Sequence, residues 1–276
     1  MFNHHAFRDG VALAGVNSIN WARIMAQIVY YFSAALSLGA PDRPVSFTVP
    51  TGNFGDIFAG YAAKRMGLPI GRLAIATNDN DILARMLAGG VYETRGVVET
   101  TSPSMDIQVS SNFERLLFEA SGRNAESVVR AMDGLKQSGR FAVAEGALET
   151  IRRDFDAGRS TMDETAATIR AVKAGSAYLA DPHTATAIKV ARDAARANAG
   201  RGRTPMVVLS TAHPAKFPAA VEAACGTRPA LPAWLGDLMQ REERYTVLPS
   251  NPKMVEDHIG RLTRAASGAA GSRSGS

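Results

Sequence analysis

The chain has 276 residues, of which 46% are hydrophobic and 21% charged, which is enough apolar material for one sizeable core or a core with a smaller lobe. No window approaches the roughly eighteen apolar residues of a membrane span and no signal segment is recognisable, so we expect a cytoplasmic protein that binds no membrane. The single Cys225 excludes a disulfide framework, and the formal charge of +5 is scattered along the chain, which argues against a nucleic-acid partner.

The first predicted element is a long amphipathic helix from Asn20 to Leu38. Its apolar residues recur at helical spacing, Asn20 is a typical N-cap, and Gly39 is a typical stop.

A strand-loop-helix-strand unit is predicted next. Val45–Val49 has the pattern of a short buried strand, Ile57–Met66 that of a helix ended by Gly67, and Leu73–Ala76 that of a second strand. This order predicts a parallel pair of strands with a right-handed crossover.

The pattern then becomes helical for a long stretch. Asn78 and Asn80 are candidate caps for a helix that ends at Ala88, and residues 124–180 are rich in polar helical segments, so we expect a helical insertion there.

The alternation of helix and strand resumes at Pro182. We expect a helix over Pro182–Ala197, a Gly/Arg-rich connection, a strand over Met206–Ser210 and a helix near Pro214; the tail from 265 to 276 has the composition of a disordered segment.

These elements predict an α/β fold in which a parallel twisted sheet is flanked by helices. We divide the chain into an α/β phosphate-binding region at 1–123, the helical insertion at 124–180, an α/β region at 181–264 that completes the domain, and a disordered tail at 265–276.

The segment VPTGNFGDIFAG, from Val49 to Gly60, is the most informative motif. A strand ends where two glycines, Gly52 and Gly55, allow a close turn and a helix begins, so free N–H groups and the positive end of the helix converge. The motif predicts a cradle for an anion, although similar turns also occur as plain connections. It is neither a P-loop nor a GxGxxG motif.

Histidines give weaker signals. His183 follows Pro182 at a helix start and His213 lies in a turn, so we assign neither to catalysis, and the remaining histidines lack companions at metal-ligand spacing, so no metal site is predicted.

Several strings together resemble the threonine synthase family. They are GVNSINWARIMAQIVYYF, VPTGNFGDIFAGYAAKRMGLPI, SPSMDIQVSSNFERLLFE, DPHTA and STAHPAKFP. The resemblance is close over residues 6–119 and returns at the last two strings. It implies a fold type II enzyme, similar to the tryptophan synthase beta chain, that binds pyridoxal 5'-phosphate and converts O-phosphohomoserine and water to threonine and phosphate.

The resemblance also implies roles for particular residues. The cofactor phosphate would be held by Gly52, Asn53, Phe54, Gly55 and Asp56, and the pyridine nitrogen would face Thr211, whose hydroxyl could instead cap the helix at Pro214. The substrate phosphate would be bound by Asn17, Ser18, Asn20 and Arg23, although plain helix capping by Ser18 or Asn20 is an alternative.

The family's Schiff-base lysine lies in a phenylalanine-lysine-aspartate motif, which is absent from this sequence. None of the six lysines (Lys64, Lys136, Lys173, Lys189, Lys216 and Lys253) takes that role, so we predict no catalytic residue here. We therefore expect a threonine synthase fragment that is inactive alone. The alternative is a non-catalytic module, or a subunit of a split enzyme with an N-terminal partner chain. Because the chain resembles only the later part of the family, we expect the apolar faces of the Trp21–Leu38 helix and the Val45–Val49 strand to lack partners.

Overall fold

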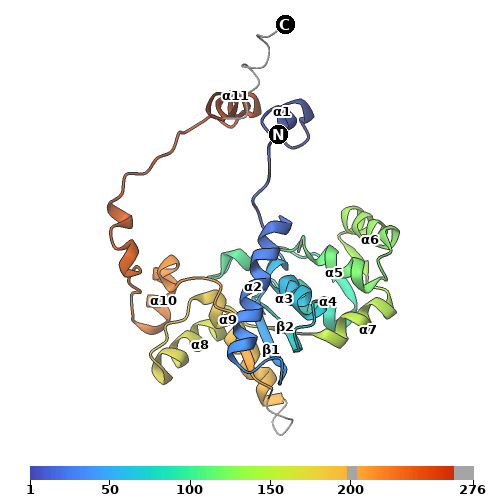
Figure 1. The fold of residues 1–276 in the computed structure, drawn as a ribbon. Coiled ribbons are helices and arrows are strands. Elements are labelled where there is room, and N and C mark those ends of the chain that lie inside the picture. Colours follow the sequence, from blue (N-terminus) through green and yellow to red (C-terminus); the bar gives the residue numbers. More distant parts are fainter. Residues whose placement is uncertain (198–203, 264–276) are drawn as a thin grey trace. The chain divides into compact units, whose positions relative to one another are not determined.

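The computed structural model describes residues 1–197 and 204–263, which form two compact units (Figure 1). Among the described residues, one unit comprises Met1–Val16 and residues 232–263, and the other lies within Asn17–Leu231. The first unit contains the helices α1 (His5–Gly10) and α11 (Pro252–Leu262) and the 3₁₀ turns Ala233–Leu235 and Leu238–Gln240. Within it, a hydrogen bond of 2.9 Å links the His4 ring to the Glu256 carboxylate.

The larger unit is built on a four-stranded parallel sheet with the strand order β5-β2-β1-β6. The strands are β1 (Val45–Pro50), β2 (Ile70–Thr77), β5 (Phe155–Arg159) and β6 (Met206–Val208). This parallel sheet with flanking helices confirms the predicted fold class. Strand β1 is buried throughout: β2 and β6 pair with its two edges, and α2 and α3 on one face and α9 on the other cover its side chains. The expectation that this strand lacks partners is therefore wrong.

The helices of this unit cover both faces of the sheet. They are α2 (Trp21–Ser37), α3 (Gly55–Arg65), α4 (Ile82–Gly89), α5 (Phe113–Ala120), α6 (Ala125–Ser138), α7 (Glu145–Asp154), α8 (Met162–Gly175), α9 (Pro182–Ala197) and α10 (Pro218–Cys225). Successive residues of a strand point to opposite faces. Phe47 and Ile75 accordingly belong to the main core, together with residues of α2, α3, α4, α5 and α7, whereas Ala76 and Val208 pack against α9.

The connections between strands leave the sheet on different faces. The chain passes from β1 to β2 through α3, which packs in the main core, and from β5 to β6 through α9 on the other face. The carboxyl ends of β1 and β6 therefore lie at a topological switch point, where open parallel sheets commonly form a ligand-binding crevice.

Helix α2 matches its prediction closely, because the signals that define it are local. The Asn20 side chain accepts a hydrogen bond of 2.9 Å from the N–H of Ala22, as an N-cap does. One side of the helix is buried through Ile24, Tyr31 and Ala35. A neighbouring stripe is exposed and apolar; it consists of Trp21, Met25, Val29 and Leu36. The expectation of an uncovered apolar face thus holds for part of this helix.

The segment 124–180 is not wholly helical. It contains β4 (Arg140–Ala142), which pairs with β3 (Val91–Glu93) in a second, antiparallel sheet, and it contains β5, which pairs with β2 at the edge of the main sheet. The sequence FDAGR of β5 lacks β-branched residues, so its strand conformation depends on pairing with β2 rather than on local propensity.

The two asparagines before α4 have a different role from the predicted one. Asn78 and Asn80 do not cap α4, whose N-cap is Asp81; their side chains instead hold the segment after β3. The Gly/Arg-rich connection at 200–203 and the tail at 265–276 lie outside the described residues. Among the helices of the described ranges, none has the length and apolar character needed to cross a membrane.

Candidate cofactor- and substrate-binding site

The carboxyl end of β1 continues into a loop whose carbonyl groups accept hydrogen bonds from another segment of the chain. The Asn53 carbonyl accepts hydrogen bonds from the backbone N–H of Asn112 at 3.1 Å and from its side-chain amide at 3.0 Å. The Gly52 carbonyl accepts one from the Ser110 hydroxyl at 2.7 Å. Residues 110–112 therefore fix the orientation of these peptide groups.

The N–H groups of the same loop are free. Within the described residues, none of the backbone N–H groups of residues 52–57 has a hydrogen-bond partner. Phe54 has φ of +65°, in the left-handed region, and it directly precedes the helical Gly55, so successive N–H groups converge at the positive end of α3. We call residues 52–57 the anion loop, because this geometry suits a bound anion.

Gly52 is required for a different reason from the one that the sequence suggested. A Cβ atom at Gly52 would lie 2.5 Å from the carbonyl oxygen of Ser104 and 3.3 Å from the Cα of Met105. A Cβ at Gly55 would lie 3.3 Å from the Asn112 side chain. Both glycines therefore make room for neighbouring parts of this chain, and the residue of this loop with a positive φ is Phe54.

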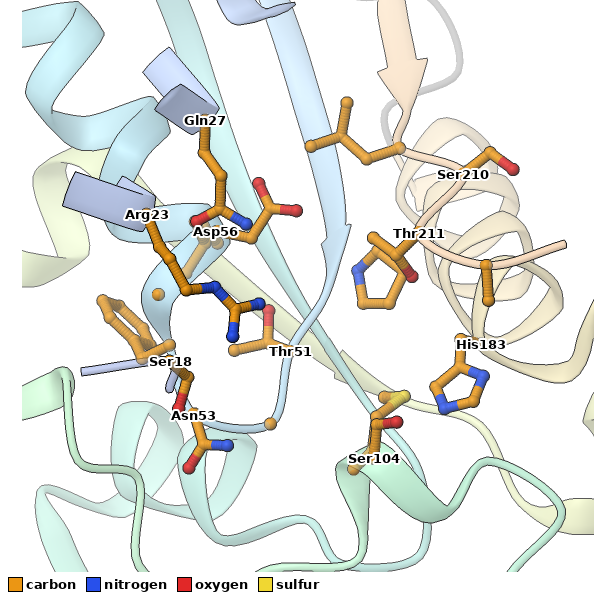
Figure 2. A pocket seen from close by; sticks show the side chains of 18 of the residues that line it. Ser18, Arg23, Gln27, Thr51, Asn53, Asp56, Ser104, His183, Ser210 and Thr211 are labelled. Carbon is orange, nitrogen blue, oxygen red and sulfur yellow. The ribbon is translucent and has the colours of Figure 1, made fainter. Parts of the chain in front are cut away.

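A cavity of about 650 Å³ opens beside the anion loop, between the ends of β1 and β6. Figure 2 shows Ser18, Arg23 and Asn53 on one side of it and Thr211 and His183 on the other. The loop residues Gly52, Asn53, Phe54, Gly55 and Asp56 all line the cavity, and so does Thr211. The structure thus brings together every residue that the sequence analysis assigned to the cofactor.

The four residues assigned to the substrate phosphate divide into two pairs. Ser18 and Arg23 line the cavity. Asn17 and Asn20 are used locally: the Asn17 side chain accepts from the N–H of Ile19 at 3.1 Å, and Asn20 caps α2. Helix capping, the alternative for Asn20, is therefore observed, while Arg23 presents its exposed cation at the cavity.

Thr211 is exposed and lies three residues after β6. The alternative role for its hydroxyl, capping the turn at Pro214, is taken by another residue. The N–H of Ala215 donates to the His213 ring at 3.2 Å, so the turn Pro214–Lys216 is capped without Thr211.

The Asp56 carboxyl group is a buried acidic group in this cavity. The Tyr31 hydroxyl donates to one carboxylate oxygen at 3.0 Å and to the Asp56 carbonyl at 2.9 Å. Loss of hydration on burial raises the pKa of Asp56 above its ordinary 3.8, although hydrogen bonds from Tyr30 and Tyr31 act in the opposite direction. Burial and the nearby carboxylate also raise the pKa of Tyr31. A negative charge on the Asp56 side chain itself is thus disfavoured.

Replacing Asp56 with asparagine is expected to raise the melting temperature at pH 7. A raised pKa in the folded protein means that the unfolded chain releases the proton first, so the native carboxyl costs stability as the pH rises from 3.8 through the folded pKa. Asparagine stays neutral and can still accept the Tyr31 hydrogen bond. Melting curves between pH 3 and pH 8 should show an advantage of Asp56→Asn that vanishes at the acid end. An advantage that does not change with pH would contradict this account.

Several cavity residues were not assigned from the sequence. Ser104 and Met105 come from the turn Pro103–Met105, Lys216 and Phe217 from the segment after β6, and His183 from the start of α9. Each lies far in sequence from the anion loop. Ser104 and Met105 reach the cavity by packing against Gly52, and the parallel pairing of β1 and β6 brings the segment after β6 to the same edge. Their presence in the strings that resemble the family was the signal that could have found them.

The comparisons with known proteins agree with this site. Residues 184–259 match a family model described as "Threonine synthase, C-terminal". A threonine synthase of Pseudomonas aeruginosa is 52% identical over 259 residues, which cover 94% of this chain and 54% of that protein. A PLP-bound threonine synthase structure from Brucella melitensis is 66% identical, with a TM-score of 0.91 over 96% of this chain and 56% of that one. The chain belongs to the threonine synthase family. The threonine synthase structure from yeast, 38% identical with a TM-score of 0.82, supports the same fold.

This chain corresponds to the C-terminal part of threonine synthases and spans about half the length of the curated relatives that it matches. Those relatives carry the matched region within one longer chain. The comparisons therefore do not support the separate N-terminal partner chain that the sequence analysis considered.

The site fits the phosphate end of pyridoxal phosphate. The free N–H groups of the anion loop suit a phosphate dianion, which needs several donors and no counter-carboxylate. The Thr211 hydroxyl on the other side of the cavity can hydrogen-bond a ring nitrogen.

Proposed function

We propose that this chain forms the phosphate-binding side of a pyridoxal-phosphate site and acts as the C-terminal part of a threonine synthase. The whole enzyme would convert O-phosphohomoserine and water to threonine and phosphate. The observation that carries the proposal is the set of free N–H groups at residues 52–57, which open into a cavity at the switch point of the sheet.

In this proposal the anion loop binds the cofactor phosphate through the backbone of Gly52, Asn53, Phe54, Gly55 and Asp56. The Thr211 hydroxyl faces the pyridine nitrogen. Pyridoxal phosphate, when bound, supplies an electron sink for carbanion chemistry on the substrate. A hydroxyl beside the ring nitrogen stabilises a protonated ring less than a carboxylate does, so Thr211 would moderate that sink.

The substrate phosphate would bind at the start of α2. Arg23 contributes a cation at the cavity and Ser18 a lining side chain, while Asn17 and Asn20 fix the backbone that positions them. Lys216 adds a second cation to the cavity. The arrangement suits a ligand with more than one anionic group, such as a phosphorylated amino acid.

We assign no lysine of this chain to covalent attachment of the cofactor. The chain alone would then bind pyridoxal phosphate reversibly and would form no threonine. The alternative, a module that binds an anion without belonging to a catalytic site, shares the anion loop but requires no preference for the pyridoxal ring.

A binding comparison tests the proposal. We expect pyridoxal phosphate to bind at least about tenfold more tightly than pyridoxal, because the anion loop makes charge-assisted hydrogen bonds, and more tightly than inorganic phosphate, because Thr211 contacts the ring. Borohydride reduction followed by peptide mapping should give no stoichiometric lysine adduct. An adduct at Lys216 would overturn the lysine assignment, and equal affinity for inorganic phosphate and pyridoxal phosphate would favour the anion-binding module.

The substrate residues need a separate variant pair. Arg23→Ala should weaken binding of O-phosphohomoserine by about tenfold, whereas Arg130→Ala should not. Arg130 is a matched control because it lies exposed on α6 and does not line the cavity.

A further inference from the structure

His183 carries a buried nitrogen that nothing in the described part of the chain satisfies. The residue is only 4% exposed, yet its Nε2 atom has no hydrogen-bond partner among the described residues. Leaving a buried polar atom unpaired is costly, so such an atom marks a place for a partner. The histidine also lines the cavity, so the unpaired atom belongs to a residue that a bound ligand can reach.

The surroundings of Asp181 determine which nitrogen of His183 carries the proton. Asp181 is fully buried and accepts hydrogen bonds from the backbone N–H of His183 at 2.9 Å and of Thr184 at 3.4 Å, as well as from the Thr184 hydroxyl. With several donors converging on it, the carboxyl group acts as an acceptor toward Nδ1 of His183, 3.1 Å away. In the tautomer that this contact favours, the proton sits on Nδ1 and Nε2 keeps a free lone pair.

The ring of His183 is held in place by packing as well as by Asp181. Its centroid lies 4.8 Å from that of Phe217, which also lines the cavity. Figure 2 places His183 and Thr211 on one side of the cavity and Asn53 of the anion loop on the other. A ligand whose phosphate occupies the anion loop would thus present its opposite end to His183.

We propose that Nε2 of His183 accepts a hydrogen bond from a hydroxyl or N–H group at the non-phosphate end of the ligand in this cavity. His183 would then select phosphorylated ligands that carry such a donor and discriminate against a bare phosphate. The inference rests on the proposed function for the identity of the ligand, pyridoxal phosphate.

Two substitutions test this role. His183→Phe keeps an aromatic ring against Phe217 but removes the acceptor, and His183→Gln keeps a polar group. We expect His183→Phe to weaken pyridoxal phosphate binding by about tenfold and His183→Gln by less. Affinity for inorganic phosphate should stay within about twofold in both, because that ion occupies the anion loop alone. His258→Ala is the control, since His258 does not line the cavity, and melting curves check the fold of each variant.

A spectroscopic measurement on the unaltered chain remains decisive even if a variant fails to fold. Nitrogen-15 NMR of labelled histidines should show His183 with the proton on Nδ1, and its Nε2 signal should shift when pyridoxal phosphate binds but not when inorganic phosphate does. An unshifted Nε2 signal, or full affinity of His183→Phe, would overturn the inference while leaving the proposed function intact. Failure of the unaltered chain to bind pyridoxal phosphate would instead overturn both.

Discussion

Replacing Gly52 with valine is expected to reduce the affinity for pyridoxal phosphate by about 100-fold and to lower the melting temperature by roughly 4–8 °C. The new Cβ would meet the Ser104 carbonyl oxygen at 2.5 Å. The backbone fixes the positions of both atoms, so no side-chain rotation can relieve the clash. The loop and the Ser104–Met105 wall must separate. Two effects follow: lost packing between them and misdirected N–H groups in the anion loop. Thermal melts and ligand titrations measure the two effects independently.

Gly146→Ala is the matched control for this substitution. Gly146 lies in α7, and a Cβ placed there has no heavy atom within 4 Å. Alanine favours a helix over glycine by roughly 0.5–1 kcal/mol, so the melting temperature should stay the same or rise slightly, with no change in binding. If Gly52→Val kept full affinity for pyridoxal phosphate, the anion loop would not be the phosphate site.

Elements with local signals could be predicted from the sequence. The order of strand, glycine-rich loop, helix and strand around Val49–Gly60 predicted the parallel pair of β1 and β2, and Pro182–Ala197 forms a helix with the predicted bounds. In both cases the capping residues, apolar periodicity and breakers lie within the element itself.

Elements that depend on distant partners could not be predicted from the sequence. Strand β5 has the sequence FDAGR, and it is a strand because it pairs with β2 at a distance of about eighty positions along the chain. Asn78 and Asn80 have the composition of helix caps, but a longer-range network recruits their side chains. No local pattern distinguishes these two uses of asparagine.

The candidate site shows the same division. The anion loop is one continuous segment, so the sequence analysis could name its first five residues, 52–56, as a group. His183 was judged an ordinary residue because it follows Pro182 at a helix start. Its contact with Asp181 and its unpaired Nε2 become apparent only when α9 is packed beside the cavity. The sequence likewise could not show why position 52 needs glycine, because the reason is the close contact between Gly52 and the Ser104 carbonyl.

Asp106 is the residue whose loss should disturb the cavity wall most. Its carboxylate accepts hydrogen bonds from the side chains of Asn78 at 2.7 Å and Asn80 at 3.0 Å, and from the backbone N–H and hydroxyl of Thr100 at 2.8 and 2.7 Å. These bonds fix the chain between Thr100 and Asp106, which includes the wall residues Ser104 and Met105. Removing the carboxylate leaves the backbone N–H of Thr100 without its acceptor. It also removes one acceptor from each of the buried amides of Asn78 and Asn80.

We expect Asp106→Ala to destabilise the fold by about 3 kcal/mol, a fall of roughly 6–12 °C in melting temperature, and to weaken pyridoxal phosphate binding by more than the stability loss explains. The extra loss arises because the Ser104–Met105 wall, which packs against Gly52 of the anion loop, becomes mobile. Binding must therefore be titrated at a temperature where the variant is folded. Asp133→Ala is the control: Asp133 is exposed on α6, with only a 4.0 Å ion pair to Lys136, and its loss should cost less than about 0.5 kcal/mol. A folded Asp106→Ala variant with unchanged affinity would mean that the wall formed by Ser104 and Met105 does not contact the ligand, and that the cavity binds through the anion loop and the His183 side alone.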